Sequence, residues 1–311
     1  MFQMKYFRSY PWGMQLFLLL MLVLTLMSCS AFLCLKLMPV FTPYTFVQLT
    51  SVDEHSPASL IRIAIIIQGF MSLFIFLVPS FLFAYLSHPR PAAYLGLRRP
   101  GKTVQLLLAV LVMLGAIPML QLIQVWISRI NFGPGVKAAQ AANDGMMNAF
   151  LYVPTFGAFL KAFLVMAIIP ACGEELFFRG VLLRLSKRLS KKMTIPILFT
   201  AAVFAYTHSN IYGLLSIFLA GVLLAVIYYL TGSLWCSIAA HMSFNGIQVI
   251  LSYINGDAAQ KATDTISYGL VAGGAALFGI AFYLLWKYRT PLPADWTDDF
   301  KGEEKEIANQ Y

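Results

Sequence analysis

The chain alternates between long apolar runs and short polar segments. The apolar runs carry few charged residues and cover about residues 12–36, 60–87, 104–128, 156–185, 194–209, 211–231, 233–254 and 267–287. A helix rises about 1.5 Å per residue, so roughly 20 apolar residues cross a hydrocarbon core of about 30 Å. Most of the runs reach this length, and 194–209 is the shortest. The pattern predicts an all-α fold, a polytopic transmembrane helical bundle of about eight spans.

The composition agrees with a membrane location. Of the 311 residues, 59% are hydrophobic and 11% are charged, whereas soluble domains carry roughly 25% charged residues. The four cysteines, Cys29, Cys34, Cys172 and Cys236, all lie in apolar runs, so they indicate neither a disulfide framework nor paired metal ligands. We therefore expect an integral, multi-pass membrane protein in contact with lipid and exclude an ordinary soluble domain.

The basic residues predict the orientation of the chain. The net charge is +9, and most of the 22 Lys and Arg residues lie in alternate loops and ends that share one side when the N-terminus is placed inside. Positive residues accumulate on cytoplasmic loops, so both termini are expected to be cytoplasmic. A charge that follows the topology in this way argues against a nucleic-acid partner. Because we find no eukaryotic targeting signal, we expect the cytoplasmic (inner) membrane of a bacterium.

The chain divides into four parts. These are N-terminal transmembrane helices with their loops (1–154, about three spans), a core segment (155–254), a last transmembrane helix (255–288) and a charged cytoplasmic tail (289–311). A polar outer loop that contains an interfacial helix is expected at 130–150. The basic start followed by LMSCS (Leu26–Ser30) also fits a cleaved signal peptide. The apolar run continues well past this motif, so we favour a first transmembrane span.

Glu174 and Glu175 lie side by side within the apolar run KAFLVMAIIPACGEELFFRGVLLRL. An ionisable side chain in hydrocarbon costs at least about 2.5–3.5 kcal/mol, so the pair indicates a functional site. On a helix, Glu175 can pair with Arg179 four residues later, whereas Glu174 is rotated by about 100°. We expect Glu175 and Arg179 to form a neutral structural pair and Glu174 to point into the bundle. Pro170, which lacks an N–H, is expected to kink the helix just before the pair.

Two histidines also lie in apolar runs. His208 ends VFAYTHSN, one turn after Phe204, and His241 lies in IAAHMSFNGI, one turn before Asn245. The helical rise and the predicted topology place these groups and Glu174 in one central slab of the membrane. A glutamate beside histidines can act as a general base on water, and a histidine and an asparagine on one helical face can stabilise an oxyanion. The set predicts acyl hydrolysis without a side-chain nucleophile, and Phe204 is expected to pack beneath His208.

Three motifs then occur in a fixed order: EELFFR (174–179), FAYTH (204–208) and HMSFN (241–245). In order and spacing they resemble E-E-x-x-x-R, F-x-x-x-H and H-x-x-x-N of the CPBP family. This family comprises C-a-a-X protease and bacteriocin-processing proteins, also called Abi, and its intramembrane glutamic proteases are related to type II C-a-a-X prenyl endopeptidases. The similarity covers roughly residues 155–254. It implies an intramembrane endopeptidase that cleaves a membrane-associated protein or peptide.

The resemblance also implies a role for each motif residue. The implied catalytic residues are Glu174, His208, His241 and Asn245, with Glu175 and Arg179 in support. The first two activate water, the next two stabilise the oxyanion, and the supporting pair maintains the geometry. No cofactor is implied. In a bacterium, where prenylated substrates are not expected, peptide maturation or bacteriocin immunity is the expected role.

Two other chemistries stay open from the residues alone. Glu174, His208 and His241 are three ligand types that could hold a catalytic zinc with a water, although H-E-x-x-H is absent. Cys172, two residues before Glu174, could be a nucleophile, or simply a small residue at a helix contact.

A non-catalytic membrane protein is the alternative from a different class. An immunity scaffold or a transporter could use the buried charges for helix packing or ion coupling. A transporter is expected to show repeated halves with paired broken helices, and only the run 156–185 is interrupted.

Overall fold

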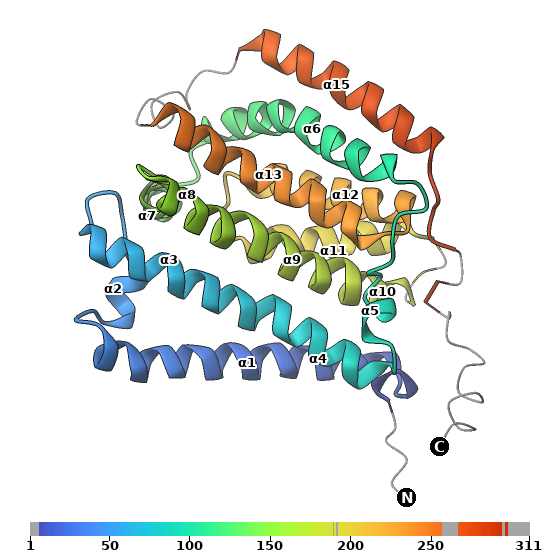
Figure 1. Ribbon diagram of the computed structural model, residues 1–311, viewed down its shortest axis with the longest axis horizontal. Coiled ribbons are helices and arrows are strands. Elements are labelled where there is room, and N and C mark those ends of the chain that lie inside the picture. Colours follow the sequence, from blue (N-terminus) through green and yellow to red (C-terminus); the bar gives the residue numbers. More distant parts are fainter. Residues whose placement is uncertain (1–5, 189, 191, 257–266, 294–295, 298–311) are drawn as a thin grey trace, which may run out of the picture.

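The computed structural model describes residues 6–188, 190, 192–256, 267–293 and 296–297. Across these residues the chain forms helices joined by short loops, with no strand. The helices pack side by side in one bundle (Figure 1). The predicted all-α class is confirmed.

The helices follow the apolar runs closely. The α-helices are α1 (Trp12–Phe41), α2 (Phe46–Thr50), α3 (Ala58–Ser72), α4 (Val78–Ser87), α5 (Pro91–Tyr94), α6 (Val104–Ser128), α7 (Pro134–Leu151), α8 (Phe156–Phe163), α9 (Ile169–Glu175), α10 (Leu183–Lys187), α11 (Thr194–Thr207), α12 (Leu214–Thr231), α13 (Leu234–Asn255) and α15 (Tyr268–Lys287). A 3₁₀ turn, η1 (Phe7–Ser9), precedes them, and three π-helical stretches join α-helices end to end: η2 (Leu73–Leu77), η3 (Leu164–Ile168) and η4 (Leu176–Leu182).

The predicted multi-pass bundle is confirmed in these helices. Within the described part of the chain, seven helices are long and apolar enough to cross a membrane: Trp12–Phe41, Ala58–Ser87, Val104–Ser128, Phe156–Lys187, Leu214–Thr231, Leu234–Asn255 and Tyr268–Lys287. The remaining predicted span, 194–209, contains α11, which is apolar but has only 14 residues. At about 1.5 Å per residue its length is about 21 Å, less than the hydrocarbon core of about 30 Å.

The polar loop predicted at 130–150 is largely helical. It contains α7 (Pro134–Leu151), which has a proline in its first turn. This position suits proline, because a backbone N–H in the first turn has no hydrogen-bond partner within the helix. The Asn148 amide donates to Glu54 Oε2 over 2.8 Å and so ties α7 to the loop before α3.

The start of α1 and the end of α15 lie at the same end of the bundle (Figure 1). The Trp12 indole at the start of α1 donates to the Leu185 carbonyl in α10 over 2.7 Å. The Thr290 amide, just after α15, donates to the Leu230 carbonyl near the end of α12 over 2.9 Å. The segments that the charge pattern predicts on one side of the membrane therefore meet at one end of the structure.

The first residues of the predicted tail pack against this end. Leu292 N–H donates to the Tyr229 carbonyl over 2.9 Å, and Trp296 is buried. The Arg184 guanidinium lies 4.5 Å from the Trp296 ring centroid and donates to its carbonyl over 3.1 Å. Residues 294–295 and 298–311, most of the predicted tail, lie outside the described residues.

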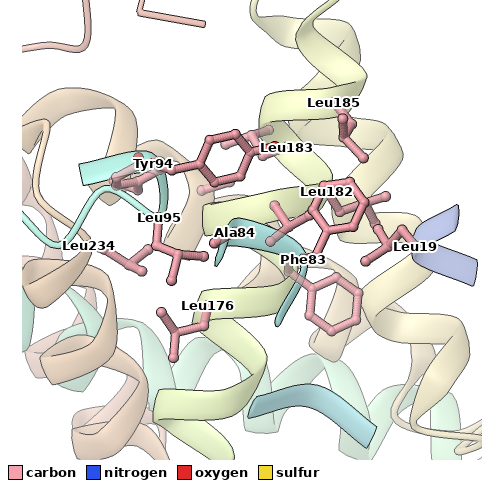
Figure 2. Packing of buried hydrophobic residues seen from close by; sticks show 14 of the residues in the cluster. Leu19, Phe83, Ala84, Tyr94, Leu95, Leu176, Leu182, Leu183, Leu185 and Leu234 are labelled. Carbon is pink, nitrogen blue, oxygen red and sulfur yellow. The ribbon is translucent and has the colours of Figure 1, made fainter. Parts of the chain in front are cut away.

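A buried apolar cluster joins the helices near the same end. Figure 2 shows its side chains converging from α1, α4, α5, η4, α10 and α13; the labelled members are Leu19, Phe83, Ala84, Tyr94, Leu95, Leu176, Leu182, Leu183, Leu185 and Leu234. The η4 residues in this cluster directly follow the two glutamates in the sequence. Their apolar packing therefore fixes the position of the helix just after Glu175.

Pro170 does not end its helix. Residues 156–187 stay helical through α8, η3, α9, η4 and α10. The π-helical stretch η3 lies directly before Ile169 and Pro170, and Pro79 likewise follows η2. A π-helical turn replaces the ordinary bonding pattern where proline removes a donor, and such turns are frequent at functional sites.

Gly115 permits the close approach of α6 and α15. A Cβ atom at this position would lie 2.5 Å from the Phe278 backbone nitrogen and 2.9 Å from the Gly274 carbonyl oxygen. Both are main-chain atoms that cannot turn away, so the helices would have to separate. Small residues serve this purpose at helix contacts in membranes, where packing replaces the hydrophobic effect.

Gly115→Ala is therefore expected to destabilise the bundle by about 1–3 kcal/mol, as overpacking does. Gly273→Ala on α15 is the matched control, because a Cβ there meets nothing within 4 Å; alanine also favours helix over glycine by about 1 kcal/mol. Thermal unfolding in detergent should show a lower melting temperature for the first variant and an equal or higher one for the second. Equal melting temperatures for both variants would contradict the packing interpretation.

Candidate active site

Four helices bring the predicted site residues together. Glu174 and Glu175 end α9, Arg179 lies in η4, His208 follows the last residue of α11, and His241 lies in α13. Residues widely separated in the sequence thus meet in one cluster, on the inner faces of the bundle. The structure places them within reach of one another, as the depth comparison predicts.

Glu175 forms a fully buried ion pair with Arg179. Arg179 Nη1 lies 2.7 Å from Glu175 Oε1, and the two side chains are 1% and 0% exposed. Arg179 Nη2 donates to the Gly221 carbonyl of α12 over 2.7 Å. On the other side, the Ser237 hydroxyl and His241 Nδ1 bind Glu175 Oε2 and Oε1 at 2.5 and 2.9 Å. A buried charge is tolerated when it is paired and hydrogen-bonded, and both charges of this pair are.

Glu174 has a different environment. It is 9% exposed, and its Oε2 lies 3.8 Å from His241 Nε2 and 4.0 Å from His208 Nε2. None of the described residues hydrogen-bonds this buried oxygen. Buried acceptors without a protein partner are uncommon and mark functional positions. The spacing lets a single water contact the carboxylate and both imidazoles.

Hydrogen bonds set the orientation of both imidazole rings. His208 Nδ1 lies 2.8 Å from the Phe204 carbonyl oxygen, and His241 Nδ1 lies 2.9 Å from Glu175 Oε1. Each partner is an acceptor, so the hydrogen is on Nδ1 in both rings. The Nε2 atoms then face Glu174. In a neutral ring Nε2 accepts a hydrogen bond, and in a protonated ring it donates one.

Phe204 packs beneath His208, as expected, and also contacts the rest of the cluster. Its ring centroid lies 4.6 Å from that of His208 and 5.9 Å from that of His241. The Arg179 guanidinium carbon lies 4.9 Å from the same centroid. An aromatic face attracts a cation where water is excluded, so Phe204 supports the Arg179 guanidinium as well as the two imidazoles.

Asn245 lies one helical turn after His241 on α13 and is partly buried. No hydrogen bond to its amide comes from the described residues, so both amide hydrogens are available to a ligand. His208 has the most exposed side chain of the cluster, at 34%. The cluster is therefore closed on the α13 side and more open at the end of α11.

Two contributors to the cluster were missed by the sequence analysis. Ser237 donates to Glu175, and the Gly221 carbonyl accepts from Arg179. Ser237 could have been found, because it lies four residues before His241 and so shares its helical face. The Gly221 contact could not, because a backbone carbonyl carries no side-chain signal.

Metal ligation was left open from the residue types. Within the described part of the chain, no group of three or more His, Cys, Asp or Glu side chains has an arrangement that could hold a metal ion. Cys172 lies within the same helix, partly buried and not disulfide-bonded.

Fold and site together define a polytopic helical membrane protein with a buried carboxylate and two imidazoles facing one point. Residues 156–247 match the family described as type II CAAX prenyl endopeptidase Rce1-like. This segment contains every motif residue named above, and the CPBP resemblance is confirmed over it. Comparison with curated proteins and with solved structures gave no match.

Glu175→Gln and Glu174→Gln are expected to separate structural from chemical roles. The first removes the charge that compensates Arg179 and should destabilise the fold by about 3–5 kcal/mol, the usual cost of an unpaired buried charge. The second removes a carboxylate without a hydrogen-bonding protein partner at Oε2 and should leave stability unchanged or raised. Melting temperatures in detergent measure both. A Glu174→Gln variant as unstable as Glu175→Gln would contradict this division.

Proposed function

We propose that the protein is an intramembrane endopeptidase that hydrolyses a peptide bond with an activated water. The observation that carries the proposal is the convergence of Glu174 Oε2 with the Nε2 atoms of His208 and His241. The family match of residues 156–247 supports a CAAX-type protease. The glutamic mechanism and the roles below are our proposal.

In this mechanism Glu174 and His208 hold the water. Glu174 takes one of its protons while the oxygen attacks the carbonyl carbon of the peptide bond. The resulting oxyanion accepts hydrogen bonds from Asn245 and His241. When the tetrahedral intermediate collapses, the C–N bond breaks and Glu174 returns the proton to the leaving amine.

His241 must carry a second proton to act as an oxyanion donor. Glu175 takes the Nδ1 hydrogen of His241, so a neutral ring would present only a lone pair at Nε2. Glu174, Glu175 and Arg179 together leave one excess negative charge, which an imidazolium at His241 balances. During attack the negative charge moves from Glu174 to the oxyanion, so the buried cluster keeps a constant net charge.

The proposed substrate is a membrane-associated protein or peptide. The family description names CAAX prenyl endopeptidases, whose substrates are lipidated near the cleaved end. In a bacterial inner membrane, we propose peptide maturation or protection against bacteriocins as the role of the same chemistry. The alternative is a non-catalytic immunity scaffold or transporter. The following assay would favour this alternative if no peptide cleavage depends on Glu174, His208, His241 or Asn245.

The assay compares wild-type protein with Glu174→Gln, His208→Ala, His241→Ala and Asn245→Ala in proteoliposomes. The probes are internally quenched C-a-a-X peptides with and without a farnesyl group. Loss of an oxyanion donor is expected to lower kcat about 100–1,000-fold, and loss of the general base at least about 100-fold. Glu54→Gln and His55→Ala, in an exposed loop, are the matched controls and should retain activity.

Cleavage that is unchanged in Glu174→Gln and His241→Ala would overturn the proposed mechanism. Activity that disappears with a chelator and returns with zinc would instead support metal-assisted hydrolysis. Comparing membrane proteomes of a deletion strain complemented with wild-type or Glu174→Gln protein would then identify natural substrates.

We also propose that the end of the bundle that contains the start of α1 and the end of α15 faces the cytoplasm. The support is the positive residues at this end, including Arg98, Arg99, Lys102 and Lys287. Green fluorescent protein fused after Tyr311 is expected to fluoresce, and alkaline phosphatase inserted within 134–151 is expected to be active. The reverse pattern in the two fusions would show the opposite orientation.

A further inference from the structure

Ser237 extends the H-x-x-x-N face of α13 by one turn. Ser237, His241 and Asn245 follow at intervals of four residues, so their side chains lie along one helical face. Ser237 is completely buried. Its hydroxyl lies 2.5 Å from Glu175 Oε2 and 3.0 Å from the Leu224 carbonyl oxygen of α12.

The single hydroxyl hydrogen goes to the carboxylate. An ionised acceptor forms the shorter and stronger hydrogen bond, in agreement with the two distances. The donors to Glu175 are then divided between its two oxygens: Arg179 and His241 bind Oε1, and Ser237 binds Oε2. Among the described residues, no other side chain donates to Oε2.

We propose that Ser237 is a positioning residue for the peptidase site, acting through Glu175 on His241. Its hydroxyl fixes the rotation of the Glu175 carboxylate, and the carboxylate in turn holds the Nδ1 hydrogen of His241. The imidazole Nε2 is thereby kept facing Glu174. Without the hydroxyl, Glu175 Oε2 loses its donor, the carboxylate turns, and the His241 ring loses its fixed plane and its hydrogen bond at Nδ1.

The test combines two measurements. Peptide-cleavage kinetics rest on the proposed function, whereas the NMR spectrum of His241 is independent of it. Ser237→Ala is expected to lower kcat on the quenched farnesylated peptide about 10-fold with KM changed less than about twofold, as for loss of a hydrogen bond to a charged group. Histidine-selective ¹⁵N NMR in detergent reports the hydrogen bonding of each ring nitrogen of His241, whose signals are identified by their loss in His241→Asn. Ser237→Ala should shift the Nδ1 signal, because the hydrogen bond from Nδ1 to Glu175 weakens.

Ser216→Ala is the matched control. Ser216 is also a buried serine, and its hydroxyl donates to the Leu120 carbonyl over 2.9 Å and not to Glu175. This variant should keep the His241 signals and kcat of the wild type. Ser237→Cys, with a similar volume and a weak donor, should lie between wild type and Ser237→Ala in both measurements.

Wild-type His241 signals and kcat in Ser237→Ala would overturn the proposal. Failure of both Ser237 variants to fold, with Ser216→Ala intact, would also overturn it, because the hydroxyl would then have a purely structural role. If the wild-type protein cleaves no probe, the peptidase proposal fails, and the NMR comparison alone still decides whether Ser237 positions His241.

Discussion

The buried ion pair between Glu175 and Arg179 is the constraint on which the centre of the bundle depends. Neither charge can reach water, so the protein itself must supply the partners of the pair. It does so for both Glu175 oxygens and for Arg179 Nη1 and Nη2, whereas Arg179 Nε has no hydrogen-bond partner among the described residues. The partners come from other helices: the Gly221 carbonyl from α12, and Ser237 and His241 from α13. Satisfying one ion pair therefore fixes the relative positions of three helices.

This arrangement gives two adjacent glutamates opposite properties. Glu175 is saturated by hydrogen bonds, whereas the buried Oε2 of Glu174 has none from the described residues. The helical rotation of about 100° between neighbours directs one carboxylate to the helix contacts and the other to the two imidazoles. Since His241 hydrogen-bonds Glu175 and its Nε2 faces Glu174, a shift of the ion pair would move the imidazole relative to the Glu174 carboxylate. The contacts that neutralise the Glu175–Arg179 ion pair therefore also orient His241 toward Glu174, the carboxylate that we propose as the general base.

Much of this organisation could be predicted from the sequence. Apolar runs predict helices in membranes because the bilayer leaves few alternatives, and most of the expected spans match the observed helices. Helical rise and the predicted topology placed Glu174, His208 and His241 at a similar depth, which allowed them to meet but did not show that they do. The short length of α11 was also predictable, because the shortest apolar run, 194–209, contains the whole of this helix (Thr194–Thr207). The π-helical stretches and the packing of 289–293 and 296–297 depend on tertiary contacts that local sequence does not carry.

The short length of α11 has a consequence for the surrounding lipid. A helix of about 21 Å in a core of about 30 Å is a case of hydrophobic mismatch, with a deficit of ~9 Å. If α11 begins at the membrane surface, this deficit falls at the end next to His208. Acyl chains next to this end must shorten or tilt, and headgroups and solvent follow them inward. Bilayer thickness would then determine how easily water reaches the His208 imidazole. The rate of the proposed hydrolysis would therefore depend on the acyl-chain length of the lipid.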